Sequence, residues 1–196
     1  MSENQTASAQ NTIDSSHPLL SKLGPGIPPL ERVPTEAGGL YVALWARDIN
    51  GRYHWGLYLA CTATDGVLYD QIDATTPTGW KLAIRRYTMA TSANLCGLLK
   101  VAVYIPGTGD TSVDELSNEL RRVEIGTSGT CRTWVLAALF ELAKFGWIDV
   151  KNDAATRNRI EWEAYSLAQI AQDKEVKHVA RSSHPQIGQS NVSTQP

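Results

Sequence analysis

Five short runs of apolar, β-branched and aromatic residues follow one another between residues 40 and 105, and their spacing constrains the fold most strongly. The runs cover residues 40–46, 55–61, 67–72, 80–87 and 95–105. Residues typical of turns separate the earlier runs, as in Thr64-Asp65-Gly66 between the second and the third. Short runs joined in this way predict five strands in a mainly antiparallel sheet.

The hydrophobic period changes after Pro106-Gly107. Apolar residues at 113, 116, 120 and 123 recur at intervals of three or four, which predicts a short amphipathic helix. A second helix is predicted from Cys131 to Phe145, ended by Gly146, and a third over roughly 154–171. Strands followed by helices predict an α+β fold, with an antiparallel sheet packed on the central helix that starts at Cys131.

The aromatic residues mark the part of the chain that can build a core. All of them, six Trp, seven Tyr and two Phe, lie between Tyr41 and Tyr165. The two ends are rich in Ser, Gln, Asn and Pro instead, so burial there cannot offset the entropy cost of ordering. We therefore predict a disordered N-terminal arm at 1–38, one domain at 39–172 and a disordered C-terminal tail at 173–196.

Charge and composition exclude several classes of protein. The chain has 18 basic and 20 acidic residues, without a basic stripe, so no nucleic-acid partner is expected. It has no apolar run of about 18 residues and no secretory signal, so no integral membrane segment is expected. Three widely spaced cysteines are typical of reduced thiols in the cytoplasm or nucleus. No metal-ligand spacing or phosphate-loop motif occurs, so neither a metal nor a cofactor is predicted.

Three residues with the chemistry of thiol catalysis lie at informative positions. His54 is at the start of the second strand, Asp70 lies on the third, and Cys131 begins the central helix. Unpaired N–H groups and the positive end of the helix dipole favour a thiolate at a helix N-terminus. A nucleophilic thiol also needs an imidazole to exchange its proton and a polar group to orient that imidazole. Cys131, His54 and Asp70 are therefore the candidate catalytic residues.

The register of the hairpin between the second and third strands decides which carboxylate reaches His54. A three-residue loop puts Asp70 opposite Gly56 and diagonal to His54 on the same face, at ~7 Å. Gly56 has no side chain and so leaves room for Asp70. A four-residue loop would instead put Asp73 opposite His54. Asp70 is the preferred orienting residue, and Asp73 is the alternative.

Three segments resemble a known family. They are Tyr53-His54-Trp55-Gly56-Leu57-Tyr58-Leu59, Asp65-Gly66-Val67-Leu68-Tyr69-Asp70 and Thr130-Cys131-Arg132-Thr133-Trp134-Val135. Together they resemble the circularly permuted papain-like fold of the NlpC-like superfamily, near its lecithin:retinol acyltransferase-like branch. The resemblance implies a base on a strand, a polar partner on the next strand, and a nucleophile on a later helix. The branch has a second histidine where this chain has Asp70.

The residues and the resemblance together predict a cysteine-dependent acyl-transfer enzyme that works through a thioester. Its substrate would be a small-molecule or peptide acyl compound. With water as acceptor the enzyme would be an amidase, a thiol peptidase or a thioesterase, and with another nucleophile an acyltransferase. The alternative is a non-catalytic module of the same fold that binds a peptide or a partner protein, because a fold does not establish an activity.

Overall fold

A computed structural model describes residues 35–48, 51–74, 79–92, 94–104, 110–125, 129–173 and 178–183. The strands are β1 (Gly39–Ala46), β2 (Tyr53–Ala60), β3 (Asp65–Asp73), β4 (Trp80–Thr88), β5 (Leu95–Val103) and β6 (His178–Arg181). The helices are α2 (Asp110–Arg121), α3 (Cys131–Lys144) and α4 (Ala154–Asp173), with the short 3-10 helix η1 (Met89–Thr91) before β5. The five predicted strands and three predicted helices are therefore all present.

The strands form one sheet in the order β4-β3-β2-β1-β5-β6. Every neighbouring pair is antiparallel except β5 and β6, which run parallel. The predicted α+β class and the mainly antiparallel sheet are confirmed. β2, which carries His54, lies inside the sheet between β1 and β3.

β6 was not predicted, and it lies within the segment assigned to the C-terminal tail. Its parallel register pairs Leu98 with Val179, and the Ser182 N–H donates to the Lys100 carbonyl at 2.8 Å. The hydroxyl of Ser182 also bonds to the buried carboxylate of Glu163 on α4. These contacts attach residues 178–183 to the domain. Of the rest of the predicted tail, Asp173 ends α4, while residues 174–177 and 184–196 lie outside the described residues.

The end of the predicted N-terminal arm also contacts the domain. Thr35 is buried, and its N–H donates to the Ala63 carbonyl at 2.7 Å. Glu36 forms an ion pair with Lys100 on β5. Residues 1–34 of the predicted arm lie outside the described residues.

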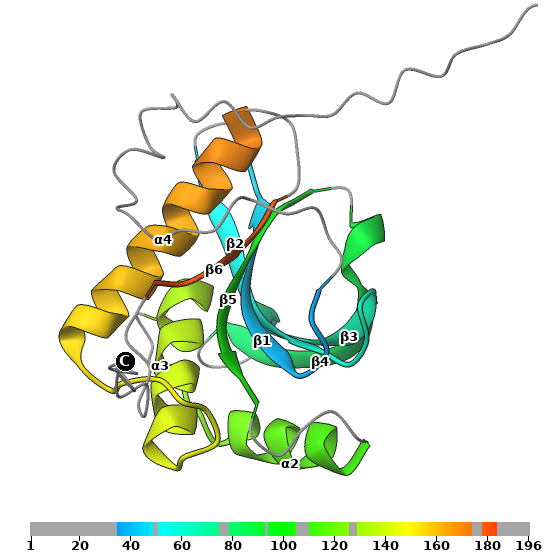
Figure 1. Cartoon of the computed structure of the whole chain (residues 1–196), viewed down its shortest axis with the longest axis vertical. Coiled ribbons are helices and arrows are strands. Elements are labelled where there is room, and N and C mark those ends of the chain that lie inside the picture. Colours follow the sequence, from blue (N-terminus) through cyan, green and yellow to red (C-terminus); the bar gives the residue numbers. More distant parts are fainter. Residues whose placement is uncertain are drawn as a thin grey trace, which may run out of the picture.

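The two faces of the sheet have different cores. Strand residues such as Val42 and Leu57 pack on one face with Leu139 of α3 and Ala164 of α4. Figure 1 shows these two helices side by side along that face, with the strands curving away from them. The opposite, inner face holds a smaller cluster around Tyr58. Because side chains alternate along a strand, consecutive residues of β2 reach different faces.

Within the described residues, none of the helices combines the length and the apolar character that crossing a bilayer requires.

Candidate active site

The paired strands β2 and β3 bring His54 and Asp70 together. Their register sets Gly56 opposite Asp70, which confirms the register predicted from the three-residue loop. His54 Nε2 lies 2.7 Å from Asp70 Oδ2, and the Asp70 side chain is 1% exposed. A Cβ atom on Gly56 would lie 3.2 Å from the Asp70 Cβ, so the glycine provides the space that Asp70 occupies.

Asp73, the alternative partner, lies elsewhere. It is exposed at the end of β3, where it pairs with Trp80 of β4. No hydrogen bond or ion pair between described residues joins Asp73 to His54. The carboxylate that contacts the imidazole is therefore that of Asp70.

Cys131 reaches His54 where β2 and β3 separate. Pairing between these strands stops at Gly56 and Asp70, so the first residues of β2 have no partner on β3. The thiol of Cys131 is buried there, close enough to the His54 side chain and the Trp55 backbone N–H for both to lower its pKa. The structure thus brings all three predicted site residues together.

The N-terminus of α3 is fixed by a capping box. Thr130 has an extended backbone, and its side chain accepts a hydrogen bond from the Thr133 N–H at 3.2 Å. In return, the Thr133 hydroxyl accepts a hydrogen bond from the Thr130 N–H at 2.7 Å. Such a cap fixes where the helix begins, and Cys131 is its first residue. The N–H groups of Cys131 and Arg132, the first two residues of the helix, have no partner within the helix, so they are available beside the sulfur.

The electrostatics of the site favour a thiolate–imidazolium pair. Burial alone would raise the pKa of Cys131, but hydrogen bonds from His54 and the Trp55 N–H, with the charges of His54 and Arg47, lower it below its ordinary value. Burial would also lower the pKa of His54, but hydrogen bonds to Asp70 and Cys131 outweigh it and raise that pKa to about 9. Each group therefore stabilises the charged form of the other.

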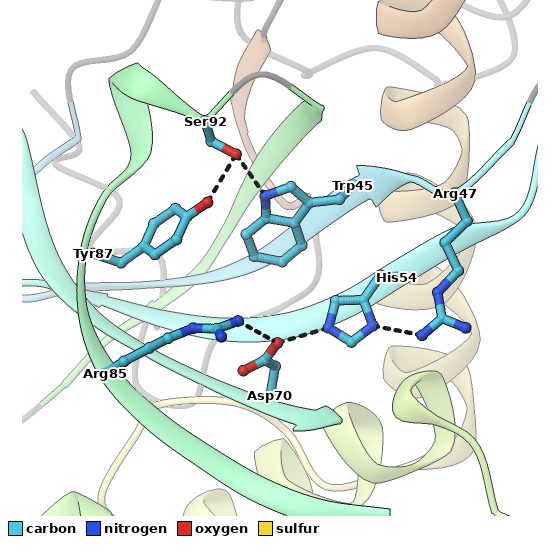
Figure 2. A network of polar contacts seen from close by, with 7 residues as sticks. All are labelled: Trp45, Arg47, His54, Asp70, Arg85, Tyr87 and Ser92. Carbon is cyan, nitrogen blue, oxygen red and sulfur yellow. Dashed lines mark hydrogen bonds and ion pairs between the residues drawn. The ribbon is translucent and has the colours of Figure 1, made fainter. Parts of the chain in front are cut away.

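Two arginines extend this arrangement into a row of polar contacts, shown in Figure 2. Arg85 on β4 donates to Asp70 Oδ2 at 2.8 Å, so this oxygen contacts both Arg85 and His54. The other oxygen, Oδ1, is buried and has no hydrogen-bond partner among the described residues. At the far end of the row, Arg47 Nη2 lies 3.1 Å from His54 Nδ1.

An aromatic wall covers one side of the imidazole. The ring of Trp45 lies 5.8 Å from that of His54 and meets Tyr87 edge-on at 6.2 Å. Both aromatic side chains donate to the hydroxyl oxygen of Ser92, Trp45 at 2.9 Å and Tyr87 at 3.0 Å. This shared acceptor fixes the wall next to the row of charges, as Figure 2 shows.

Two cavities flank the start of β2. One, of about 330 Å³, is lined by Trp45, Arg47, His54, Asp70, Ile72, Asp73, Arg85 and Tyr87. The other, of about 600 Å³, is lined by Trp55, Arg132, Asn158, Glu161, Trp162 and Tyr165. His54 and Trp55 are consecutive, so alternation along β2 directs one side chain toward each cavity. His54 itself lines the smaller cavity, and Arg132, the residue after Cys131, lines the larger one.

The other two cysteines have different surroundings. Cys96 is buried on β5, and burial raises the pKa of its thiol. Cys61 is half-buried just after β2. All three cysteines are free thiols, and Cys131 is the one beside an imidazole. In the described part of the chain, no cluster of three or more His, Cys, Asp or Glu residues has the arrangement of a metal site.

Sequence reasoning did not identify Arg47 or Arg85. Arg47 could be found only with the β1–β2 register. This register sets Trp45 opposite His54, which puts Arg47 diagonal to His54 on the same face. Arg85 has a similar relation to Asp70, which lies opposite Ala83. The β3–β4 connection gave no fixed loop length from which to derive that register.

Comparison of this chain with protein-family models, curated proteins and solved structures found no significant match.

Proposed function

We propose that the protein is a cysteine-dependent acyl-transfer enzyme, with Cys131 as nucleophile, His54 as proton carrier and Asp70 as the residue that positions His54. The observation that supports this most strongly is the place of His54, which contacts Asp70 at 2.7 Å through Nε2 and lies close enough to Cys131, at the start of α3, to lower the pKa of its thiol. The order His54, Asp70, Cys131 along the chain also agrees with the resemblance to permuted papain-like proteins.

The reaction begins on the thiolate of Cys131. Its sulfur attacks the substrate carbonyl carbon, and the carbonyl electron pair moves to the oxygen, which accepts hydrogen bonds from N–H groups at the start of α3. His54 then gives its proton to the leaving group as the carbon–leaving-group bond breaks, which leaves an acyl thioester on Cys131. Attack by water or another nucleophile, with His54 taking that proton, releases the acyl group and restores the thiolate–imidazolium pair.

Asp70 sets which nitrogen of His54 faces the sulfur. Asp70 accepts from Nε2, so Nδ1 is the nitrogen that exchanges a proton with Cys131. The buried carboxylate also stabilises the imidazolium that forms when Cys131 is ionised. Arg85, which shares the same carboxylate oxygen, holds Asp70 in place from β4.

The experiment that tests this proposal is acylation of the full chain by p-nitrophenyl acetate. We expect a burst of p-nitrophenolate, with the acetyl group on Cys131 when peptides are mapped after an acid quench. Cys131→Ala should lose the burst, and His54→Ala should reduce it strongly. Cys61→Ser is the matched control, because it removes the half-buried thiol outside the site, and it should keep the burst.

Equal acetylation of all three cysteines, or a burst that is the same in His54→Ala, would overturn the proposal. In either case the non-catalytic binding module of the same fold would be the better interpretation. One observation favours this binding module as the second candidate function. Trp162 and Tyr165, both partly exposed, line the larger cavity next to the site. Aromatic side chains of this kind are common in protein and peptide interfaces.

A further inference from the structure

The contact between Arg47 and His54, the candidate base, depends on whether His54 Nδ1 carries a proton. It follows directly after β1 and is exposed, and its Nη2 lies 3.1 Å from His54 Nδ1. A guanidinium group can only donate hydrogen bonds, so this contact is a hydrogen bond only while Nδ1 carries no proton. Nδ1 is also the nitrogen that the proposed reaction assigns to Cys131. Arg47 and Cys131 therefore compete for one atom of His54.

Among the described residues, no carboxylate pairs with the Arg47 guanidinium, in contrast to Arg85 and Arg132 near the site. Arg85 is paired with Asp70 at 2.8 Å, and Arg132 is paired with Glu161 at 3.2 Å. None of the ion pairs between described residues includes Arg47. A guanidinium that contacts an imidazole instead of a carboxylate remains available for an anion, and its planar fork matches a carboxylate group.

Arg47 also lies at a cavity rather than on a flat surface. The cavity of about 330 Å³ has Arg47 and His54 on its wall, with Trp45 and Tyr87 as apolar surface. This volume suits a small organic group. Asp73 is on the same wall but belongs to β3, two strands away from β1 in the sheet, which is ~10 Å at the usual strand spacing. Asp70 also lines the cavity, but it is paired with His54 and Arg85, so the end of the cavity that holds Arg47 and His54 is the cationic end.

We infer that this cavity is the specificity pocket for acyl substrates that carry a carboxylate near the reacting carbonyl, and that Arg47 is the residue that binds the carboxylate. The inference rests on the proposed function, because it assigns the substrate class of that same site. The carboxylate would accept both N–H groups of one guanidinium edge, and the aromatic wall of Trp45 and Tyr87 would contact the carbon chain.

Binding of such a substrate would also change the contact at His54. A carboxylate is a stronger partner for a guanidinium than a neutral imidazole nitrogen is, so a bound substrate draws Arg47 away from Nδ1. Nδ1 then has Cys131 as its remaining partner and can exchange the proton. Neutralisation of Arg47 by the bound carboxylate thus further favours the imidazolium of the Cys131 and His54 pair.

Two alkylating reagents of nearly the same shape test this inference. Iodoacetate and iodoacetamide both form a bond from the Cys131 sulfur to a CH₂ carbon as iodide leaves, but only iodoacetate carries a carboxylate. The ratio of their rate constants at Cys131 is measured on the full chain by quantitative peptide mapping. Arg47→Gln should lower this ratio by about fivefold, the factor that an exposed ion pair of about 1 kcal/mol gives.

Two further variants make the result specific. Arg47→Lys keeps the charge and should retain most of the ratio. Arg132→Gln removes an equal charge from the residue next to Cys131, on the side of the larger cavity, and should leave the ratio unchanged. A ratio that is unchanged in Arg47→Gln, or that falls as far in Arg132→Gln, overturns the inference.

Failure of the inference can be distinguished from failure of the proposed function. If the iodoacetamide rate at Cys131 does not depend on His54, the proposed function fails. The iodoacetamide rate can instead depend on His54 while the ratio of the iodoacetate and iodoacetamide rate constants is the same in Arg47→Gln. In that case the assignment of Cys131 as nucleophile and His54 as base is supported, and the carboxylate pocket is wrong.

Discussion

Replacing Asp70 by asparagine should lower the pKa of His54. Asp70 is almost fully buried, and its Oδ2 accepts hydrogen bonds from His54 at 2.7 Å and from Arg85 at 2.8 Å. Asparagine has nearly the same shape and keeps one oxygen that can accept from His54 Nε2, so the ring should stay in place. The negative charge that stabilises the imidazolium is lost. Arg85 is about half exposed and can turn toward solvent.

The size of the effect follows from the raised pKa. The pKa of His54 is about 9 against an ordinary value of 6.5, a difference of about 2.5 pH units that Asp70 and Cys131 produce together against the opposing effect of burial. Loss of an adjacent opposite charge typically lowers such a pKa by at least about 1 unit. We therefore expect the pKa in Asp70→Asn to fall by about 1 to 1.5 pH units, which corresponds to about 2 kcal/mol at 1.36 kcal/mol per unit.

The size of the stability change depends on pH. A raised pKa means that the folded protein binds the proton more tightly than the unfolded chain does. This contribution to the free energy of unfolding is present in full below about pH 6.5 and is lost as pH rises through about 9. Asp70→Asn should therefore cost about 2 kcal/mol more at pH 6 than at pH 9.5.

The assay combines an NMR titration with denaturant unfolding. The Cε1–H signal of His54 is assigned by its absence in His54→Ala, and its midpoint is compared between the natural chain and Asp70→Asn. Asp73→Asn is the matched control, because it makes the same chemical change on an exposed residue of the same strand. An unchanged midpoint in Asp70→Asn, or a lower midpoint in Asp73→Asn, would refute the assignment of Asp70 as the partner of His54.

Two further substitutions test how the backbone positions the site. Thr130→Ala removes the capping box of α3. It should lower the free energy of unfolding, measured in urea, by about 1 kcal/mol and should slow alkylation of Cys131. An unchanged stability would mean that the cap does not fix the start of the helix. Gly56→Ala should destabilise the domain by about 1–3 kcal/mol and displace Asp70, because the new Cβ would lie 3.0 Å from Leu68 Cδ1 and 3.2 Å from the Asp70 Cβ; retention of the His54 midpoint would show that Asp70 tolerates the methyl group.

Local sequence patterns were sufficient to predict the elements and one decisive register. The short loop between β2 and β3 allows few pairings, and alternation along each strand then fixes which side chains share a face. The register that sets Gly56 opposite Asp70 was the preferred one of the two that these rules left open, and the structure confirms it. Cys131 was likewise predicted at the first position of a helix, since the apolar stripe of α3 begins there.

Features that depend on pairing between distant parts of the chain could not be predicted from the sequence. β6 has four residues in a polar context, and it is held by its parallel pairing with β5 and by the bond from Ser182 to Glu163. Arg85 reaches Asp70 only through the β3–β4 register, and its own neighbours in sequence give no sign of this. The approach of α3 to the open edge of β2 likewise depends on packing between elements far apart in the chain.

The pH dependence of Cys131 alkylation by iodoacetamide tests the central claim most directly. With the natural chain, Cys131 should react well below the ordinary thiol pKa of 9.0, because His54 and the Trp55 N–H stabilise its thiolate. Cys96, whose pKa is raised by burial, should stay inert under the same conditions. In His54→Ala, the rate at Cys131 should fall at neutral pH and its midpoint should move upward. A profile that is the same in both proteins, or a Cys131 as unreactive as Cys96, would contradict the assignment of Cys131 and His54 as a catalytic pair.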